Sequence, residues 1–223
     1  MSTYAESREE AWNRRAGLTG DVDFTMMYIA HDAFNRDMNR LVTAADAGRG
    51  LSQAAVATWR VVSAQLHTHH TAEDKALWPA LAAVLTDPGE LRVTEQMAAE
   101  HATLDPRMEQ IDAAIAHKDG AALAAELKLL AKGLSAHMVH EETEALPLAA
   151  RRLGKAGWDA FTREVRAQQG IRGAAQYLPW VLEGASEPVQ GTVMQMLPPP
   201  ARLLYRRVWE PRYRKSALLD MAR

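Results

Sequence analysis

The sequence predicts an all-α protein whose main unit is an up-down-up-down four-helix bundle. Its 223 residues are 48% hydrophobic, which is enough for a sizeable core, and Ala, Leu, Glu and Arg predominate. Runs of alternating β-branched residues are missing, and Gly and Pro are sparse before residue 150. Turn signals divide that part of the chain into four long stretches, and long helices joined by short loops pack as antiparallel neighbours. We expect the bundle over residues 21–153.

Each predicted helix has recognisable boundaries. Asp21 or Asp23 can cap the first helix and Ser52 the second, because a side-chain oxygen there accepts a free backbone N–H. Gly154 can close the fourth, because glycine tolerates the left-handed conformation found just past many helix ends. The predicted ranges are about 21–47, 52–85, from Glu90 or Thr94 to 118, and 121–152.

Two histidine–glutamate pairs repeat along the chain. His69 with Glu73, and His137 with Glu141 68 residues later, share the pattern His-x3-Glu followed by an acidic residue. Residues four apart lie on one face of a helix, so each pair offers an imidazole and a carboxylate to the same side. An imidazole and a carboxylate on one helix face can bind the same metal ion, and the sequence contains this arrangement twice.

A lone histidine precedes each pair. His31 and His101 lie 70 residues apart, and each has a methionine seven residues later, Met38 and Met108. Each predicted helix therefore carries one part of the set, and in an antiparallel bundle the four inward faces can meet at one site. The candidate ligands are His31, His69, Glu73, His101, His137 and Glu141.

Prolines fall at matched places in this pattern. Pro79 and Pro147 each lie ten residues after a candidate histidine, and Pro106 follows Asp105 in the third helix. Proline lacks an amide hydrogen and collides with the preceding turn, so we expect a kink or a helix end at both matched places. We also expect a kink at Pro106, because the residue before a proline disfavours helical geometry.

The donor set indicates which metals fit. The chain has no cysteine, so any metal is held by nitrogen and oxygen. Four imidazoles and two carboxylates suit two ions such as iron better than calcium or magnesium, which favour oxygen ligands alone. If Glu73 and Glu141 bridge two metals, positions remain for an oxo or hydroxo bridge and an outside ligand, although manganese or a mixed pair fits the same donors.

Taken together, these residues resemble the hemerythrin-like, or HHE cation-binding, domain family over roughly residues 21–150. Two His-x3-Glu stretches in register, two upstream histidines, and Pro79 and Pro147 carry the resemblance. The resemblance implies a four-helix bundle around a non-haem di-iron centre, with His31, His69, Glu73, His101, His137 and Glu141 as ligands.

The chain departs from the oxygen-carrying hemerythrins in two places. Their third helix supplies a His-x3-His pair, whereas the position four after His101 is Asp105, and Glu141 stands where the carriers use an Asp spaced five from its His. We therefore expect a fifth histidine to be missing and the site to be more open, which favours redox chemistry, sensing or detoxification over reversible O2 storage.

Other side chains near the motif have open roles. We expect His67, His70 and His140 to be exposed or to contact ligands indirectly, with direct ligation as the alternative. Asp74 and Glu142 are expected to pair with Arg or Lys, or to bond to a ligand histidine. Whether Asp105, His70 or His140 binds the metal directly stays open. Tyr28 most simply packs in the core, and metal ligation or radical chemistry at its hydroxyl is the alternative.

Charge divides the chain into two parts. Residues 1–150 hold 13 Lys and Arg and 22 Asp and Glu (net −9), whereas residues 151–223 hold 13 and 6 (net +7). We expect residues 154–223 to form a helical, basic extension that docks on the acidic bundle. A protein partner for it is the alternative, and nucleic-acid binding is not expected because the whole chain is negative.

The sequence thus predicts a di-iron protein that binds or reduces O2, H2O2 or NO in oxygen or NO response or in protection from oxidative stress. Weak peroxidase, catalase-like or NO-related activity is one form of this function. The alternative is an iron- or redox-sensing interaction protein in which the metal mainly stabilises the bundle. No secretory signal or membrane span is recognisable, so we expect a cytoplasmic protein.

Overall fold

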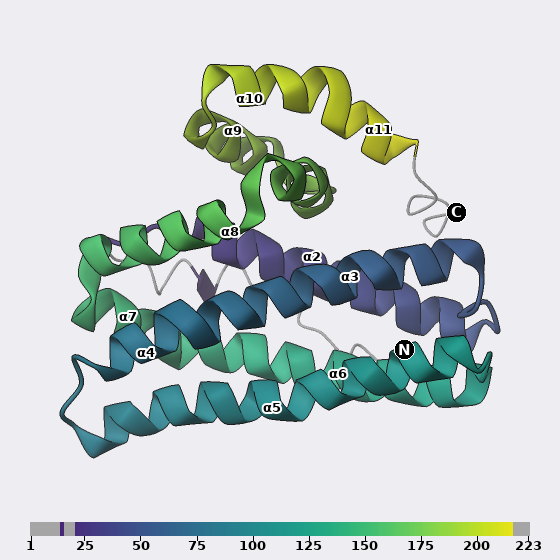
Figure 1. Cartoon of the computed structure of the whole chain (residues 1–223), viewed down its shortest axis with the longest axis horizontal. Helices are drawn as coiled ribbons and strands as arrows, with labels where there is room; N and C mark the ends of the chain where they lie inside the picture. Colours follow the sequence, from purple (N-terminus) through teal and green to yellow (C-terminus); the bar gives the residue numbers. More distant parts are fainter. Residues whose placement is uncertain (1–13, 16–20, 216–223) are drawn as a thin grey trace.

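The computed structural model describes residues 14–15 and 21–215, and every regular element within them is helical (Figure 1). Four long helices form the bundle: α2 (Thr25–Asp46), α3 (Gln53–Ala72), α5 (Pro88–Ala116) and α6 (Gly120–His140). Helix α2 packs against α3 and α6, and α5 packs against the same two helices, so the four close into a ring. The predicted all-α bundle with an additional helical C-terminal part is confirmed.

The helix caps agree with the sequence in part. Ser52 accepts a backbone N–H of the first turn of α3 at 3.2 Å, as expected. Helix α2 begins later than predicted, at Thr25, whose N–H donates to Asp23 at 2.9 Å. Helix α5 begins earlier than predicted, because Asp87 caps it and Pro88 occupies its first position, where a missing N–H costs nothing.

Both matched prolines follow a widened helical turn. In the first turn, the N–H of Trp78 donates to the carbonyl of Glu73, five residues back rather than four. In the second, the N–H of Leu146 donates to the carbonyl of Glu141 in the same way. Proline, which cannot donate, is the second residue after each wide turn. The elements are η1 (Glu73–Leu77) with α4 (Trp78–Ala82), and η2 (Glu141–Ala145) with α7 (Leu146–Arg152). Single π-turns of this kind often mark functional sites.

Pro106 behaves differently. Helix α5 continues through it, and Asp105 keeps helical geometry. The helix thus includes a residue whose local preference, before a proline, is not helical, and α5 packs against α3 and α6. The kink expected at Pro106 stays a prediction.

A polar layer divides the core of the bundle into two apolar clusters. One cluster is centred on Phe34, Trp59 and Ile111, and the other includes Trp78 and Trp158. The candidate ligands lie between the two clusters along the helices, so apolar packing encloses them from both ends. Rigid helices thereby hold the polar groups in place from four sides.

The chain beyond the bundle is also helical. Its elements are α8 (Gly154–Leu182), α9 (Glu187–Met196), α10 (Pro199–Leu204), η3 (Tyr205–Trp209) and α11 (Glu210–Arg214). Gly170, with φ 57° and ψ −171°, breaks α8 into two parts. The first part lies along the bundle, and after the bend the chain leads into α9, α10 and α11 outside it (Figure 1).

Ion pairs join this extension to α2, but with the charges opposite to the expected ones. Arg36 and Arg40 of the bundle contact Glu183 of the extension, at 3.5 and 2.8 Å. Asp37 accepts hydrogen bonds from both arginines and from the indole N–H of Trp180, the last at 2.8 Å. Bundle cations therefore meet an extension acid, and the net charges of the two parts do not predict the contact.

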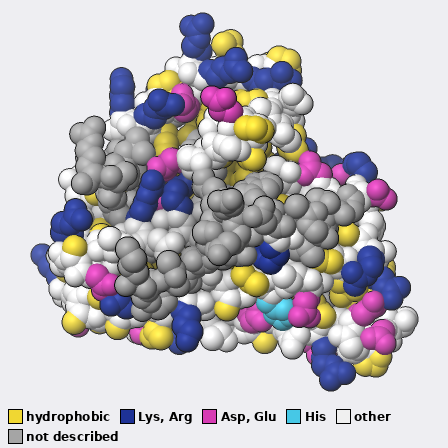
Figure 2. Space-filling view, turned by 180° about the vertical axis from the view of Figure 1, so that it is seen from behind, with side chains coloured by type: hydrophobic (Ala, Val, Ile, Leu, Met, Phe, Trp, Pro, Cys, Tyr) yellow, Lys and Arg dark blue, Asp and Glu magenta, His cyan; other side chains and the backbone are white. Residues whose placement is uncertain are grey.

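The aromatic residues of the C-terminal helices face inward. Tyr205, Trp209 and Tyr213 are partly buried against the core, and Tyr213 donates to Glu183 at 2.6 Å. Arginine and lysine side chains there are mostly exposed, and Figure 2 shows them standing out on this part of the surface. These aromatic residues thus contribute to packing. Among the described helices, none is long and apolar enough to cross a membrane.

Candidate metal centre

The six predicted ligands lie together in the polar layer. Five of them are at most 2% exposed, and the side chain of His69 is 14% exposed. Nε2 of His31 lies 3.1 Å from Glu141, and Nε2 of His69 lies 3.2 Å from Glu73. The other Glu73 oxygen lies 3.5 Å from Nε2 of His101, so this carboxylate spans imidazoles of two helices.

A seventh residue, His70, joins them. It is 2% exposed, its ring stacks on that of His101 with centroids 4.0 Å apart, and its Nε2 is buried. A nitrogen of His70 groups with nitrogens of His101 and His137 within 4.8 Å. The sequence predicted four imidazoles here, and the structure places a fifth ring in the cluster; it comes from α3, next to His69, rather than from α5.

The potential donors form overlapping groups. His31, His69 and Glu141 form one, and His70, His101 and His137 form another. Glu73 and Glu141 form a third group with His137 and thereby link the two sides. Three imidazoles thus lie on one side and two on the other, with two carboxylates between them.

Outer carboxylates fix the orientation of four of the five rings. Each contacts Nδ1 and so turns Nε2 toward the centre, an arrangement typical of metal-binding histidines. The pairs are His31 with Glu142 at 2.8 Å, His70 with Asp105 at 3.1 Å, His101 with Asp74 at 2.8 Å, and His137 with Glu100 at 2.7 Å.

These contacts answer several open questions of the sequence. Asp74 contacts His101 and Glu142 contacts His31. Glu142 also forms ion pairs with Arg14 and Arg15. Asp105, 47% exposed, contacts His70 from the outside. Glu100 was missed, because nothing in its local sequence signals a bond to a helix 37 residues later.

The remaining candidates lie at the margin. His140 contacts Glu100 at 2.7 Å and is partly exposed, and His67 is exposed. The ring of Tyr28 packs under Arg15, 4.8 Å from its guanidinium carbon, and burial raises the pKa of its hydroxyl to about 12. Tyr28 therefore remains protonated at neutral pH in this environment.

The pattern of hydrogen bonds calls for a cation. With Nδ1–H donated to Asp74 and to Glu100, the rings of His101 and His137 face one another with bare Nε2 atoms 3.1 Å apart. Two lone pairs at this distance repel unless a positive charge lies between them. Both oxygens of Glu73 and both of Glu141 are likewise buried without a hydrogen-bond partner among the described residues. Buried polar groups are rarely left unsatisfied, and metal ions would satisfy these.

The pKa shifts reflect a buried centre in which two carboxylates face several imidazoles. Burial and the rings of His70 and His137 lower the pKa of His101 to about 2, so it is neutral and able to bind a metal. Burial and the nearby Glu141 raise the pKa of Glu73 well above its usual value. Burial opposes the charged form of His31, but Glu141 and Glu142 outweigh this and raise its pKa to about 9. Cations would remove the repulsion between the two carboxylates.

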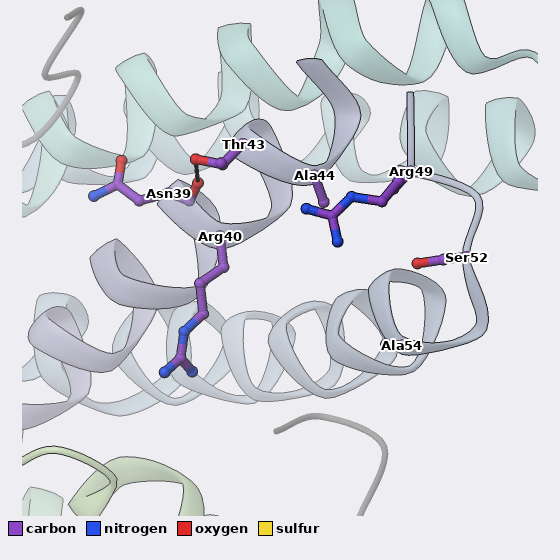
Figure 3. A pocket seen from close by; sticks show the side chains of 7 residues that line it. All are labelled: Asn39, Arg40, Thr43, Ala44, Arg49, Ser52 and Ala54. Atoms are coloured by element: carbon purple, nitrogen blue, oxygen red, sulfur yellow. Dashed lines mark hydrogen bonds between the residues drawn. The ribbon is translucent and has the colours of Figure 1, made fainter. Parts of the chain in front are cut away.

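A separate hollow lies toward the opposite end of α2 and beside the first turn of α3 (Figure 3). Asn39, Arg40, Thr43 and Arg49 contribute to its lining, and Arg40 is already paired with Asp37 and Glu183. None of the candidate metal ligands lines this hollow, so it takes no part in the site.

The fold and the centre together define a helical, metal-binding protein of the four-helix-bundle class. A family model, described as the hemerythrin HHE cation-binding domain, matches residues 23–149. This covers more than half of the chain, and the chain therefore belongs to that family. Searches of curated proteins and of solved structures returned no match.

Proposed function

We propose that the protein holds two iron ions, bridged by Glu73 and Glu141, and binds or reduces O2, H2O2 or NO. The other ligands in this proposal are His31 and His69 on one metal and His70, His101 and His137 on the other. The single observation that carries it is the convergence of five inward-facing Nε2 atoms and two buried, unpartnered carboxylates. A cytoplasmic location remains a prediction of the sequence.

The unequal division of imidazoles bears on what the centre can do. The side with His31 and His69 contributes one nitrogen fewer than the other side. An outside ligand therefore finds more room there. In this proposal His70 supplies the fifth imidazole, so the argument from a missing histidine against reversible O2 binding no longer applies. Iron at this place would supply electrons or a coordination position for a diatomic molecule or peroxide.

The protein's own residues prepare the site. Glu142, Asp105, Asp74 and Glu100 keep the rings oriented through Nδ1, and this raises the basicity of Nε2. The apolar clusters above and below exclude bulk water, which strengthens electrostatic interactions inside and protects reactive species.

Metal content and the absorption spectrum test this proposal. The double variant His69→Ala/His137→Ala removes one donor from each side, and His67→Ala/His117→Ala is the matched control because both of these histidines are exposed. We expect two irons per chain and near-ultraviolet bands in the wild type and the control, both lost in the double variant. Metal-free wild-type protein after expression in iron-rich medium would contradict the proposal.

A sensing role is the second candidate, favoured by the exposed arginines of α10 to α11 and by the many unsatisfied groups that metal would stabilise. Iron-loaded protein is exposed to O2, H2O2 and NO in turn. A spectral change supports the redox function, whereas a large gain in thermal stability with no spectral change favours the sensor.

A further inference from the structure

A cavity adjoins the centre on the side of His69. It has a volume of about 130 Å³ and lies between α2, α3 and α8. Met27 and Phe34 line it from the bundle, and Trp158, Phe161 and Val165 line it from the first part of α8, which lies along the bundle (Figure 1). The family match ends at residue 149, so residues outside the matched domain build one wall.

The cavity is too large for a diatomic molecule alone. An engineered apolar cavity of about 150 Å³ in another protein holds a benzene molecule. The aromatic and aliphatic lining here suits an apolar body of that size, because burying it removes apolar surface from water.

His69 connects this cavity with the centre, because it lines the cavity and its Nε2 lies 3.2 Å from Glu73. The other four rings of the cluster each have a carboxylate on Nδ1, but no described residue bonds to Nδ1 of His69. It is also the most exposed of the five, and it lines the cavity. With Nε2 turned toward Glu73, the ring leaves an N–H donor for an acceptor in the cavity.

The lining carries a positive charge. Arg166 of α8 lines the cavity, is exposed, and pairs with none of the carboxylates that the structure describes. Gln169 and Tyr177, on either side of the bend at Gly170, also line the cavity. A guanidinium in the lining attracts an anion, and its preferred partner is a carboxylate.

We propose that the cavity binds a small carboxylic acid with an apolar body of about the size of benzene, and that its carboxylate takes the position on His69 that outer carboxylates take on the other four rings. This rests on the proposed function only in that His69 binds metal through Nε2. The acid would then lie beside the more open side of the centre.

Binding of 4-fluorobenzoate to the full chain, followed by ¹⁹F NMR, tests the inference. Fluorobenzene supplies the apolar body alone, and acetate supplies the acid alone. We expect saturable binding of 4-fluorobenzoate at one site, weaker binding of both partial probes, and a shift of the ¹⁵N resonance of His69 Nδ1. Equal affinity for fluorobenzene would overturn the assignment of an acid, and no saturable binding would overturn the site.

Two substitutions locate the probe. Val165→Trp fills the cavity and should abolish binding, whereas Arg163→Trp on the exposed face of the same helix should leave it unchanged. Arg166→Gln, at an exposed position that does not endanger folding, should weaken binding about tenfold. Unchanged affinity in Val165→Trp or in Arg166→Gln would contradict the placement.

Metal content of the same samples separates this inference from the proposed function. Iron-loaded protein that fails to bind the probe overturns the cavity site alone. Metal-free protein that binds the probe supports the cavity and contradicts the di-iron proposal.

Discussion

Nδ1 of His31 lies 2.8 Å from a carboxylate oxygen of Glu142, and the opposite nitrogen of the same ring lies 3.1 Å from Glu141. One histidine thus connects two glutamates that are adjacent in sequence. Glu141 faces the centre, whereas Glu142 orients the ring from outside and is held in turn by Arg15. The position of His31 therefore depends on Glu141 and Glu142, and through Glu142 on Arg15, although these residues lie far apart in the chain.

Removing the charge of Glu142 should weaken metal binding. Glu142→Gln keeps the size of the side chain but loses the anion that orients His31, so we expect metal affinity to fall about 10- to 100-fold. Competition with a chelator measures this. Glu144→Gln is the control, because Glu144 is 59% exposed and lies outside the cluster. Equal affinities in the two variants would contradict the orienting role.

His70 should be needed for full metal content, whereas the nearby His67 should not. His70→Ala removes one of three imidazoles on its side of the centre, and we expect the chain to lose one metal or to bind it far more weakly. His67→Ala, at an exposed position on the same helix, should retain the full metal content. Metal analysis of both variants decides the matter, and full occupancy in His70→Ala would show that four imidazoles suffice.

Metal removal should destabilise the bundle. Without cations, Glu73 and Glu141 remain buried without hydrogen-bond partners among the described residues. At free metal one hundred times its dissociation constant, each site adds about 2.7 kcal/mol to the free energy of unfolding. Thermal unfolding in ferrous iron without oxygen, compared with chelator, measures the gain. A midpoint that does not respond to metal concentration would contradict it.

Asp37 should anchor the extension to α2. It is 2% exposed, and Asp37→Ala leaves Arg36 and the indole of Trp180 without this partner. Breaking a buried ion pair costs about 3–5 kcal/mol of unfolding free energy. Asp46→Ala on the same helix removes an exposed pair with Lys128 and should cost less than about 1 kcal/mol. Denaturant unfolding compares the two variants, and similar losses would mean that Asp37 has no special role.

Acid should weaken the same contact. Burial opposes the charged forms of Asp37 and Glu183, but Arg36 and Arg40 outweigh it and lower the pKa of both carboxyl groups. Their stabilisation is therefore fully present above the ordinary carboxyl pKa of about 4 and is lost as pH falls through the lower folded values. Unfolding measured between neutral pH and pH 3 should show this loss, and Asp37→Ala should show less of it.

The bundle and most of the centre were predictable from short-range spacing. A helix returns to the same face after four residues, so the pairs His69–Glu73 and His137–Glu141 had to point together once helical. Ser52 and the matched Pro79 and Pro147 likewise marked local events, a cap and two wide turns, whose cause lies within a few residues.

His70 was not predictable in this way. Neighbouring residues on a helix point about 100° apart, so spacing alone turns His70 away from the face that His69 shares with Glu73. Both rings reach the centre because it holds donor groups on two sides, and α5 places His101 against His70. Only the packing of α3 against α5 decides this.

The sequence by itself therefore determined the helical class, the repeat and six inward-facing candidates, because these depend on periodicity along one chain. Tertiary structure alone decided the fifth imidazole, the outer carboxylates such as Glu100, and the contact of Arg36 and Arg40 with Glu183. Those features depend on distances between helices, and neither net charge nor spacing contains such distances.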